Sequence, residues 1–354
     1  MNRILQGNVF DKLKEIESES IQCVVTSPPY WGLRDYGTAS WIGGDENCNH
    51  YRDNHVTNSC TTGHSTSQKS GGVSDSIYKK ECKKCGAIRK DEQLGLEETP
   101  EEYVDNMVKV FREIRRVLKD GGTVWLNLGD SYASNFKGSG GPSKLQDGNA
   151  GSRYDVIKLK HGVKEKDLVG IPWRVAFALQ ADGWYLRQDI IWHKPNPMPE
   201  SIQDRCTKSH EYIFLLSKSA KYFYDMDAIR EPAQDHGPRN RDHFRNGTHD
   251  PYLKHRGLKN NDFEETGRNK RSVWTINTKP YKDAHFAVFP PKLPELCIKA
   301  GSSEGDVVLD PFFGSGTTGY VAQRLGRKWL GIELNPEYIK IAEKRFQQQE
   351  LFTV

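Results

Sequence analysis

The stretch D-V-V-L-D-P-F-F-G-S-G-T-T-G, residues 306–319, decides the fold. A short apolar run rich in valine stops at Asp310, and a glycine-rich turn then opens a segment with helical spacing. Glycines at positions 314 and 316 remove the side chains that would keep a ligand away from the backbone N–H groups. A strand, a glycine turn and a helix in this order are typical of a nucleoside-binding unit in an α/β protein.

The next strand, residues 328–333, indicates which ligand the turn binds. It ends at Glu333, 23 residues after Asp310, where a Rossmann-like unit places the carboxylate that accepts from a ribose diol. No lysine precedes Thr317, so the turn is not a phosphate-binding P-loop. Two alternatives remain for G-S-G-T-T-G: a dinucleotide-binding turn, and a tight turn that binds no ligand. Asp310 suits a cationic amino group, which S-adenosylmethionine carries in place of phosphate.

Outward from this stretch, strands alternate with helices along most of the chain. This alternation predicts a wound α/β sheet. The predicted strands are residues 21–26, 123–128, 185–193, 211–217, 306–310 and 328–333, and the predicted helices are 99–118, 170–182, 317–325 and 336–347, with Gly121-Gly122 ending the first helix.

Composition adds less than position does. Of the 354 residues 36% are hydrophobic, and two stretches contain few of them: residues 49–81 and 228–272. Neither can bury enough surface to fold alone, so we expect both to be excursions from the sheet, and 134–166 to be a flexible loop. The net charge of +4 excludes no partner, but Lys and Arg exceed Asp and Glu by 10 to 7 within 228–272. We find no apolar run long enough for a membrane span and no signal peptide, and therefore expect a cytoplasmic protein.

A second motif, T-S-P-P-Y at 26–30, follows the strand at 21–26. Two prolines lock a turn at the strand's carboxyl end, where α/β folds bind ligands. The turn presents the Ser27 hydroxyl, the Pro28 carbonyl and the Tyr30 ring. Taken alone, S-P-P-Y is equally compatible with an ordinary surface turn. Cys23, inside the strand, is expected in the core.

A third motif predicts a structural zinc site. Cys82 and Cys85 form a C-x-x-C-G knuckle, and Cys48 and His50 lie 34 and 35 residues before its two cysteines. Seven cysteines are an odd number and fit metal ligation better than a disulfide framework. Four free surface residues are the alternative. The substitute ligands are His55, Cys60 and His64.

The first two motifs together resemble those of the β-class amino DNA methyltransferases, a circularly permuted family in which the catalytic motif precedes the cofactor motif. The resemblance covers most of the chain and includes G-N-V-F (7–10), V-L-K-D-G-G-T-V-W-L-N-L-G-D (117–130), D-I-I-W-H-K-P-N-P-M-P (189–199), F-P-P-K-L-P (289–294) and G-I-E-L-N (331–335). It implies a Rossmann-like S-adenosylmethionine-dependent methyltransferase fold. On this basis we divide the chain into core parts at 1–41, 99–227 and 273–354, a zinc-binding insertion at 42–98 and a target-recognition insertion at 228–272.

The resemblance also implies roles for particular residues. The implied catalytic residues are Ser27, Pro28, Pro29 and Tyr30, and Tyr30 would stack on a base flipped out of the duplex. Trp192 is expected to help hold that base, and a core role is the alternative. The implied cofactor-binding residues are Asn8, Asp310, Phe312, Gly314, Ser315, Gly316, Thr317 and Glu333. Asn8 departs from the family pattern, which often has Asp at this position. The candidate DNA contacts within the second insertion are Arg239, Arg241, Arg245, Arg256, Lys270 and Arg271. The alternative for 228–272 is a solvated connection, and the zinc-binding insertion is the rival for recognition of DNA.

Members of the family with serine in the first motif position mostly methylate cytosine N4, which makes N4 of cytosine the expected target and N6 of adenine the alternative. The expected partner is double-stranded DNA, together with a cognate restriction endonuclease in a bacterium or phage, and a homodimer is left open. The competing hypotheses are a methyltransferase acting on RNA or a small molecule, and a zinc-containing DNA-binding module without catalysis. Transfer of labelled methyl groups to DNA, RNA or metabolites separates the three.

Overall fold

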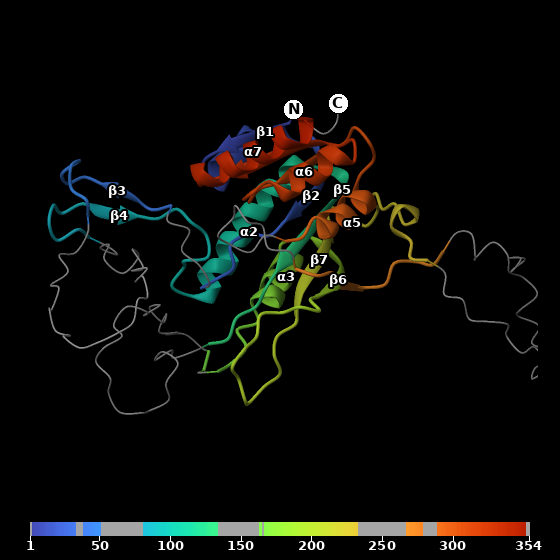
Figure 1. Ribbon diagram of the computed structural model, residues 1–354, viewed down its shortest axis with the longest axis horizontal. Helices are drawn as coiled ribbons and strands as arrows, with labels where there is room; N and C mark the ends of the chain where they lie inside the picture. Colours follow the sequence, from blue (N-terminus) through green and yellow to red (C-terminus); the bar gives the residue numbers. More distant parts are fainter. Residues whose placement is uncertain are drawn as a thin grey trace, which may run out of the picture.

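An eight-stranded sheet forms the centre of the protein in the computed structural model (Figure 1). The structure describes residues 2–32, 38–50, 81–133, 163–164, 166–232, 267–278 and 289–351. The strand order is β1-β10-β9-β2-β5-β7-β6-β8. The strands are β1 (Arg3–Gln6), β2 (Ile21–Thr26), β5 (Leu118–Leu128), β6 (Tyr185–His193), β7 (His210–Ser217), β8 (Val273–Thr275), β9 (Val307–Asp310) and β10 (Lys328–Glu333).

Of these eight strands only β7 runs against the others, being antiparallel to both β5 and β6. The remaining pairings are parallel. The predicted wound α/β sheet is therefore confirmed. Strand β1, from the start of the chain, pairs with β10 from near its end.

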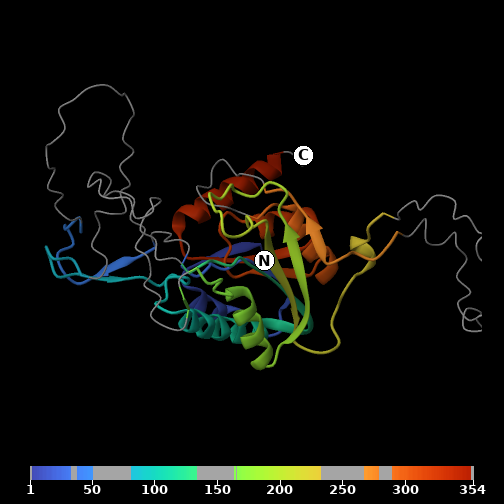
Figure 2. The same cartoon turned by 90° about the horizontal axis from the view of Figure 1, so that it is seen from below.

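Helices cover both faces of the sheet because its central strands are apolar on both faces. In β2, Val24 belongs to one buried cluster, and Cys23 and Val25 to the other. The first cluster is shared with α1 (Val9–Lys12), α2 (Pro100–Val117) and α3 (Ile171–Ala181). The second is shared with α5 (Lys292–Gly301), α6 (Thr317–Arg324) and α7 (Pro336–Leu351), which lie on the opposite side of the sheet in Figure 2.

Helix α2 begins where its capping residue predicts. The Thr99 hydroxyl accepts from the Glu102 N–H at 3.1 Å, and Pro100 occupies the first helical position. The helix ends at Val117, within one residue of the predicted end, but the two glycines do not end it: Gly121 and Gly122 lie inside β5, which follows α2 directly. A Cβ atom at position 122 would lie 2.6 Å from the Leu118 Cγ, so this glycine serves close packing inside the strand.

Several short elements were not predicted from the sequence. These are β1, α1, β8, α5, two 3-10 turns (Leu13–Glu15 and Asp227–Ile229), and the pair β3 (Ser40–Ile42) and β4 (Ile88–Lys90). Strands β3 and β4 form their own antiparallel sheet, which lies away from the main sheet in Figure 1. Among the described residues, no helix has the length and apolar character needed to cross a membrane.

Candidate active site

The two principal motifs meet at the carboxyl edge of the sheet. Strands β2 and β9 are parallel neighbours, so Thr26 and Asp310 end side by side although 284 positions separate them. The Thr26 hydroxyl donates to the Asp310 carboxylate at 2.7 Å. This bond joins the S-P-P-Y turn to the glycine-rich turn, and it is the contact that makes one site of the two motifs.

Asp310 is almost completely enclosed, with 2% of its surface exposed. Its other oxygen accepts from the Thr318 hydroxyl at 2.7 Å, and the Phe312 N–H donates to the first oxygen at 3.1 Å. Burial raises the pKa of Asp310 to about 7, against the lowering effect of these hydrogen bonds. Both carboxylate oxygens are thus engaged inside the protein, and Asp310 ties β9 to β2 and α6.

The glycine-rich turn is held to the end of β10 by Glu333. One Glu333 oxygen accepts from the Gly314 N–H at 2.7 Å and the other from the Asn335 N–H at 2.8 Å. Gly314 and Gly316 have φ angles of +51° and +77°, which glycine adopts without strain. Burial raises the pKa of Glu333, whereas its backbone hydrogen bonds act to lower it. Both Glu333 oxygens are thus bonded to backbone N–H groups, and the carboxylate lies beside the glycine-rich turn.

One polar atom in this turn has no partner. Ser315 is 2% exposed, and its hydroxyl makes no hydrogen bond among the described residues. A buried hydroxyl without a partner is costly, and such atoms are frequent at ligand sites. The neighbouring Thr317 hydroxyl, by contrast, accepts from Arg345 of α7 at 2.9 Å. Phe312 packs against the first apolar cluster.

Asn8 lies just past the carboxyl end of β1, on the same edge. Its side-chain oxygen accepts from the Phe10 N–H at 2.9 Å and so caps α1, and its amide nitrogen donates to Glu92 at 3.3 Å. An amide oxygen has two lone pairs, so this cap leaves Asn8 able to accept one further bond.

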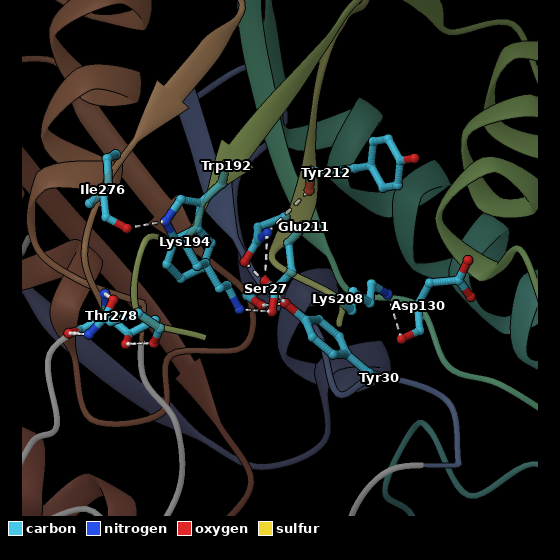
Figure 3. A network of polar contacts seen from close by, with 12 residues as sticks. Ser27, Tyr30, Asp130, Trp192, Lys194, Lys208, Glu211, Tyr212, Ile276 and Thr278 are labelled. Carbon is cyan, nitrogen blue, oxygen red and sulfur yellow. Dashed lines mark hydrogen bonds and ion pairs between the residues drawn. The ribbon is translucent and has the colours of Figure 1, made fainter. Parts of the chain in front are cut away.

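The S-P-P-Y turn contributes a chain of polar contacts, drawn in Figure 3. The Ser27 hydroxyl donates to the Tyr30 hydroxyl at 3.1 Å, and the Tyr30 hydroxyl lies 2.8 Å from a Glu211 oxygen and 3.1 Å from the Asn127 amide oxygen. Gly129 makes room for the Tyr30 ring, because a Cβ there would lie 2.5 Å from Cε2 of that ring. Burial, and then the Glu211 charge, raise the pKa of Tyr30 well above its usual value, so the phenol keeps its proton.

Glu211 and Asn127 were missed in the sequence. The Asn127 amide nitrogen donates to Glu211 at 3.1 Å, and the Lys194 ammonium forms a short ion pair with the second Glu211 oxygen. Glu211 lies near the start of β7, whose antiparallel direction brings it to the edge where the parallel strands end. The sequence could have indicated Glu211 only if the antiparallel direction of β7 had been predicted.

Trp192, expected to hold a flipped base, lies in the second apolar cluster with 3% of its surface exposed. Its indole N–H donates to the Ile276 carbonyl at 2.8 Å, and the Lys194 ammonium lies 4.3 Å from the ring centre. This enclosure favours a packing role for Trp192. Cys23 is confirmed as a core residue, since it is fully buried and burial raises the pKa of its thiol to about 12.

The four predicted metal ligands come together beside the β3–β4 sheet. One ligand atom from each of Cys48, His50, Cys82 and Cys85 lies within 4.8 Å of the others. Two sulfur atoms, those of Cys48 and Cys82, are 3.7 Å apart, and the Trp41 ring stacks on His50. Backbone hydrogen bonds at Asp45 and Ala87 lower the pKa of Cys85 to about 6. The substitute ligands His55, Cys60 and His64 lie outside the described residues.

The predicted DNA contacts divide into two groups. Arg239, Arg241, Arg245 and Arg256 lie outside the described residues. Lys270 and Arg271 bind Glu231 at 3.0 and 2.9 Å, as does Arg268 at 3.1 Å. Burial acts to raise the pKa of Glu231, but its hydrogen bonds to Lys270 and Arg271 and their charges outweigh this and lower it to about 2. The Lys270 side chain is mostly buried by this contact, whereas Arg271 stays largely exposed.

Comparison with known proteins gives three consistent findings. The family model described as DNA methylase matches residues 21–344. The Type II methyltransferase M.XycI of Xanthomonas campestris pv. cyanopsidis is 42% identical over 347 residues, which are 98% of this chain and 88% of that protein.

Among solved structures, the cytosine-N4-specific PvuII DNA methyltransferase has a TM-score of 0.57 at 19% identity, covering 98% of this chain and 86% of that one. A protein of Thermus thermophilus, described as a DNA modification methylase and solved in complex with S-adenosyl-L-methionine, has a TM-score of 0.53 at 22% identity. The match covers 98% of this chain and 94% of that one. The structural likeness shows the fold.

Proposed function

Because the chain belongs to the N6/N4 DNA methylase family, and so is an S-adenosylmethionine-dependent DNA amino-methyltransferase, we propose that it methylates the N4 atom of a cytosine flipped out of double-stranded DNA. The Thr26–Asp310 hydrogen bond carries this proposal, because it sets the Ser27 turn beside the glycine-rich turn. Methyl donor and target base would then meet at one edge of the sheet.

The chemistry at Ser27 follows from the electronic structure of the base. An exocyclic amino nitrogen is a poor nucleophile, because its lone pair is delocalised into the ring. The Ser27 hydroxyl and the Pro28 carbonyl would accept its two hydrogens, so that the nitrogen becomes pyramidal and its lone pair points at the methyl group. Orientation of this kind lowers a barrier by several kcal/mol and needs no covalent intermediate with the enzyme. Tyr30 would contact the ring of the flipped base.

The residues at the glycine-rich turn fit the methyl donor. S-adenosyl-L-methionine supplies an activated methyl group on its sulfonium sulfur. Its polar groups would bind to the Ser315 hydroxyl, to the backbone at Gly314 and to the Glu333 carboxylate. Among the described residues, the Ser315 hydroxyl has no partner and no atom beyond the chain neighbours lies within 4 Å of a Cβ placed at Gly314. We place Asn8, Phe312, Gly316 and Thr317 around them, with Asp310 fixing the turn to β2. A relative of the same fold was solved with this donor bound.

The choice of cytosine rests on Ser27 and on the family tendency of serine-containing members. The test is nucleoside analysis of DNA incubated with the protein and labelled donor. We expect N4-methylcytosine from the wild type and, for Ser27→Ala, a rate at least about 100-fold lower. Finding N6-methyladenine in its place would overturn the choice of base, and label in RNA or metabolites alone would overturn the substrate class.

We also propose that Cys48, His50, Cys82 and Cys85 bind one structural zinc ion. Three sulfurs and one imidazole nitrogen match a common tetrahedral ligand set, and the four already lie within reach of one ion. Zinc has no evident part in methyl transfer, which requires no activated water. Elemental analysis of the purified protein should give one zinc per chain, and none would refute the site.

For recognition of DNA we retain the insertion at 228–272 and propose that exposed Arg271 contacts phosphate while Lys270 stays bound to Glu231. Arg271→Ala should then reduce the salt dependence of DNA binding by about one unit of slope. The Type II designation of the relatives favours a cognate restriction endonuclease. Restriction of unmodified plasmid by the host that encodes the chain would test that partner.

A further inference from the structure

The polar chain that begins at Ser27 ends on a charged group, and this suggests a destination for a proton. Glu211 is the only carboxylate among the described residues that Tyr30 contacts, and its side chain is 15% exposed. Asn127 also lies within hydrogen-bonding distance of Tyr30, but an amide oxygen is not a base at neutral pH. Figure 3 shows the Ser27, Tyr30 and Glu211 side chains close together.

We propose that Glu211 takes up the proton that the target amino group loses, through Ser27 and Tyr30. The inference rests on the proposed function and extends it to a positioning residue that acts through two others. Lys194 forms an ion pair with the far oxygen of Glu211, which leaves the near oxygen to Tyr30 and Asn127.

The step balances in atoms and charge. The carbon–sulfur bond of the donor breaks with its electron pair left on sulfur, and the amino lone pair forms the new nitrogen–carbon bond. The nitrogen, now positive, gives one proton to the Ser27 oxygen while the Ser27 proton passes to the Tyr30 oxygen. The Tyr30 proton passes to Glu211. Sulfonium and carboxylate become thioether and carboxylic acid, so the summed charge is zero before and after.

The hydrogen-bond geometry supports this direction. The Ser27 hydroxyl donates to Tyr30 at 3.1 Å, and Tyr30 reaches Glu211 at 2.8 Å, so each proton is already on the side from which it would move. The raised pKa of Tyr30 keeps its oxygen protonated before and after the transfer, so Tyr30 passes a proton on and Glu211 is the acceptor. A chain that ends on a carboxylate also stabilises the positive charge that develops on the nitrogen during methyl transfer.

The experiment compares five proteins in single-turnover methylation across pH: the wild type, Glu211→Gln, Tyr30→Phe, the double variant, and Glu200→Gln as a control. Glu200 is a carboxylate of the loop between β6 and β7 that pairs with Arg205 outside the chain of contacts. Glutamine keeps an oxygen for Tyr30 but cannot take the proton. We expect both single variants to lose about 100-fold in rate at neutral pH, the double variant to lose no more, and Glu200→Gln to match the wild type.

The pH profile separates proton uptake from mere support of the site. The wild-type rate should fall at acid pH, and this acid limb should be absent from Glu211→Gln. The other titratable groups that face Glu211 are Lys194, Tyr30, Lys208 and His210; burial lowers the pKa of Lys208 and of His210, and all four remain in the variant. The difference between the two profiles therefore reports Glu211.

Two binding measurements complete the test. DNA affinity by fluorescence anisotropy, and flipping of a fluorescent cytosine analogue at the target position, should agree within about threefold for all five proteins. A wild-type rate in Glu211→Gln, an acid limb that persists in it, or a loss confined to binding would each overturn the proposal. Absence of methyl transfer to DNA by the wild type would instead overturn the proposed function.

Discussion

Burial of Asp310 couples its charge to the stability of the sheet. Its pKa is about 7 in the folded protein, against about 3.9 for an unperturbed aspartate. Between these values the folded state binds more protons than the unfolded state, so the free energy of unfolding falls as pH rises toward 7. The Asp310 contribution should fall by about 3 kcal/mol from pH 5 to pH 8.

Asp310→Asn should remove that slope and keep an oxygen for the Thr26 or Thr318 hydroxyl. Urea unfolding of both proteins at pH 5, 6.5 and 8 measures the difference between them. Relative to the variant, the wild type should lose stability with rising pH. Asp306→Asn, at the other end of the same segment, controls for the loss of a carboxylate, and parallel curves for Asp310→Asn and the wild type would contradict the argument.

Single residues were predictable where the sequence places them at the end of a parallel strand. Asp310, Glu333 and Ser27 each follow an apolar run directly, and the fold brings all three to one edge. Glu211 starts a strand, so the same rule placed it at the opposite end. Trp192 lies within a strand whose successive side chains point to opposite faces of the sheet. A large aromatic side chain there is compatible with the core and with a binding pocket, so the sequence could not distinguish the two.

At the scale of elements, length decided what could be predicted. The six strands and four helices read from periodicity are all present, with ends shifted by a few residues. Strands β1, β3, β4 and β8 have three or four residues, too few for alternation to show. Helix α5 was hidden by three prolines: Pro290 and Pro291 precede its first residue, and Pro294 lies in its first turn.

The β3–β4 sheet is an element that its own contacts hardly support. Two strands of three residues are marginal in water, and Ile42 and Ile88 are both more than half exposed. If the four-ligand cluster binds zinc, ligation supplies the missing folding energy. Chelation should therefore lower the melting temperature and increase proteolysis within 38–50 and 81–98, and returning zinc should reverse both.

Cysteine variants give the matched comparison for this zinc prediction. Cys85→Ser should lower zinc content and reproduce the chelated state, whereas Cys206→Ser should leave both unchanged because Cys206 is an exposed cysteine outside the cluster. Equal zinc content in the two variants would refute the ligand assignment. Unchanged melting after chelation of the wild type would refute the structural role.

At the scale of the whole molecule, the parallel pairing of β9 with β2 brings together two segments from opposite ends of the sequence. The composition of the chain could not predict this pairing, because a net charge of +4 is a property of the whole chain and does not tell which segments are neighbours in space. The pairing could be predicted from the order of the two motifs and from the position of each at the carboxyl end of a strand. One segment carries the glycine-rich turn that would bind the donor, and the other carries Ser27, which would bind the base.

This division predicts that the two ligands can be separated by mutation. Donor at 100 times its dissociation constant should raise the free energy of unfolding by about 2.7 kcal/mol in the wild type. Ser27→Ala should keep this increase and lose methylation, because Ser27 serves the base. Ser315→Ala should lose part of it, because the hydroxyl that has no hydrogen-bond partner among the described residues would no longer bind the donor. Differential scanning fluorimetry with and without donor, checked by calorimetric titration, measures both. Loss of donor stabilisation in Ser27→Ala, or its full retention in Ser315→Ala, would mean that the two motifs do not divide the ligands in this way.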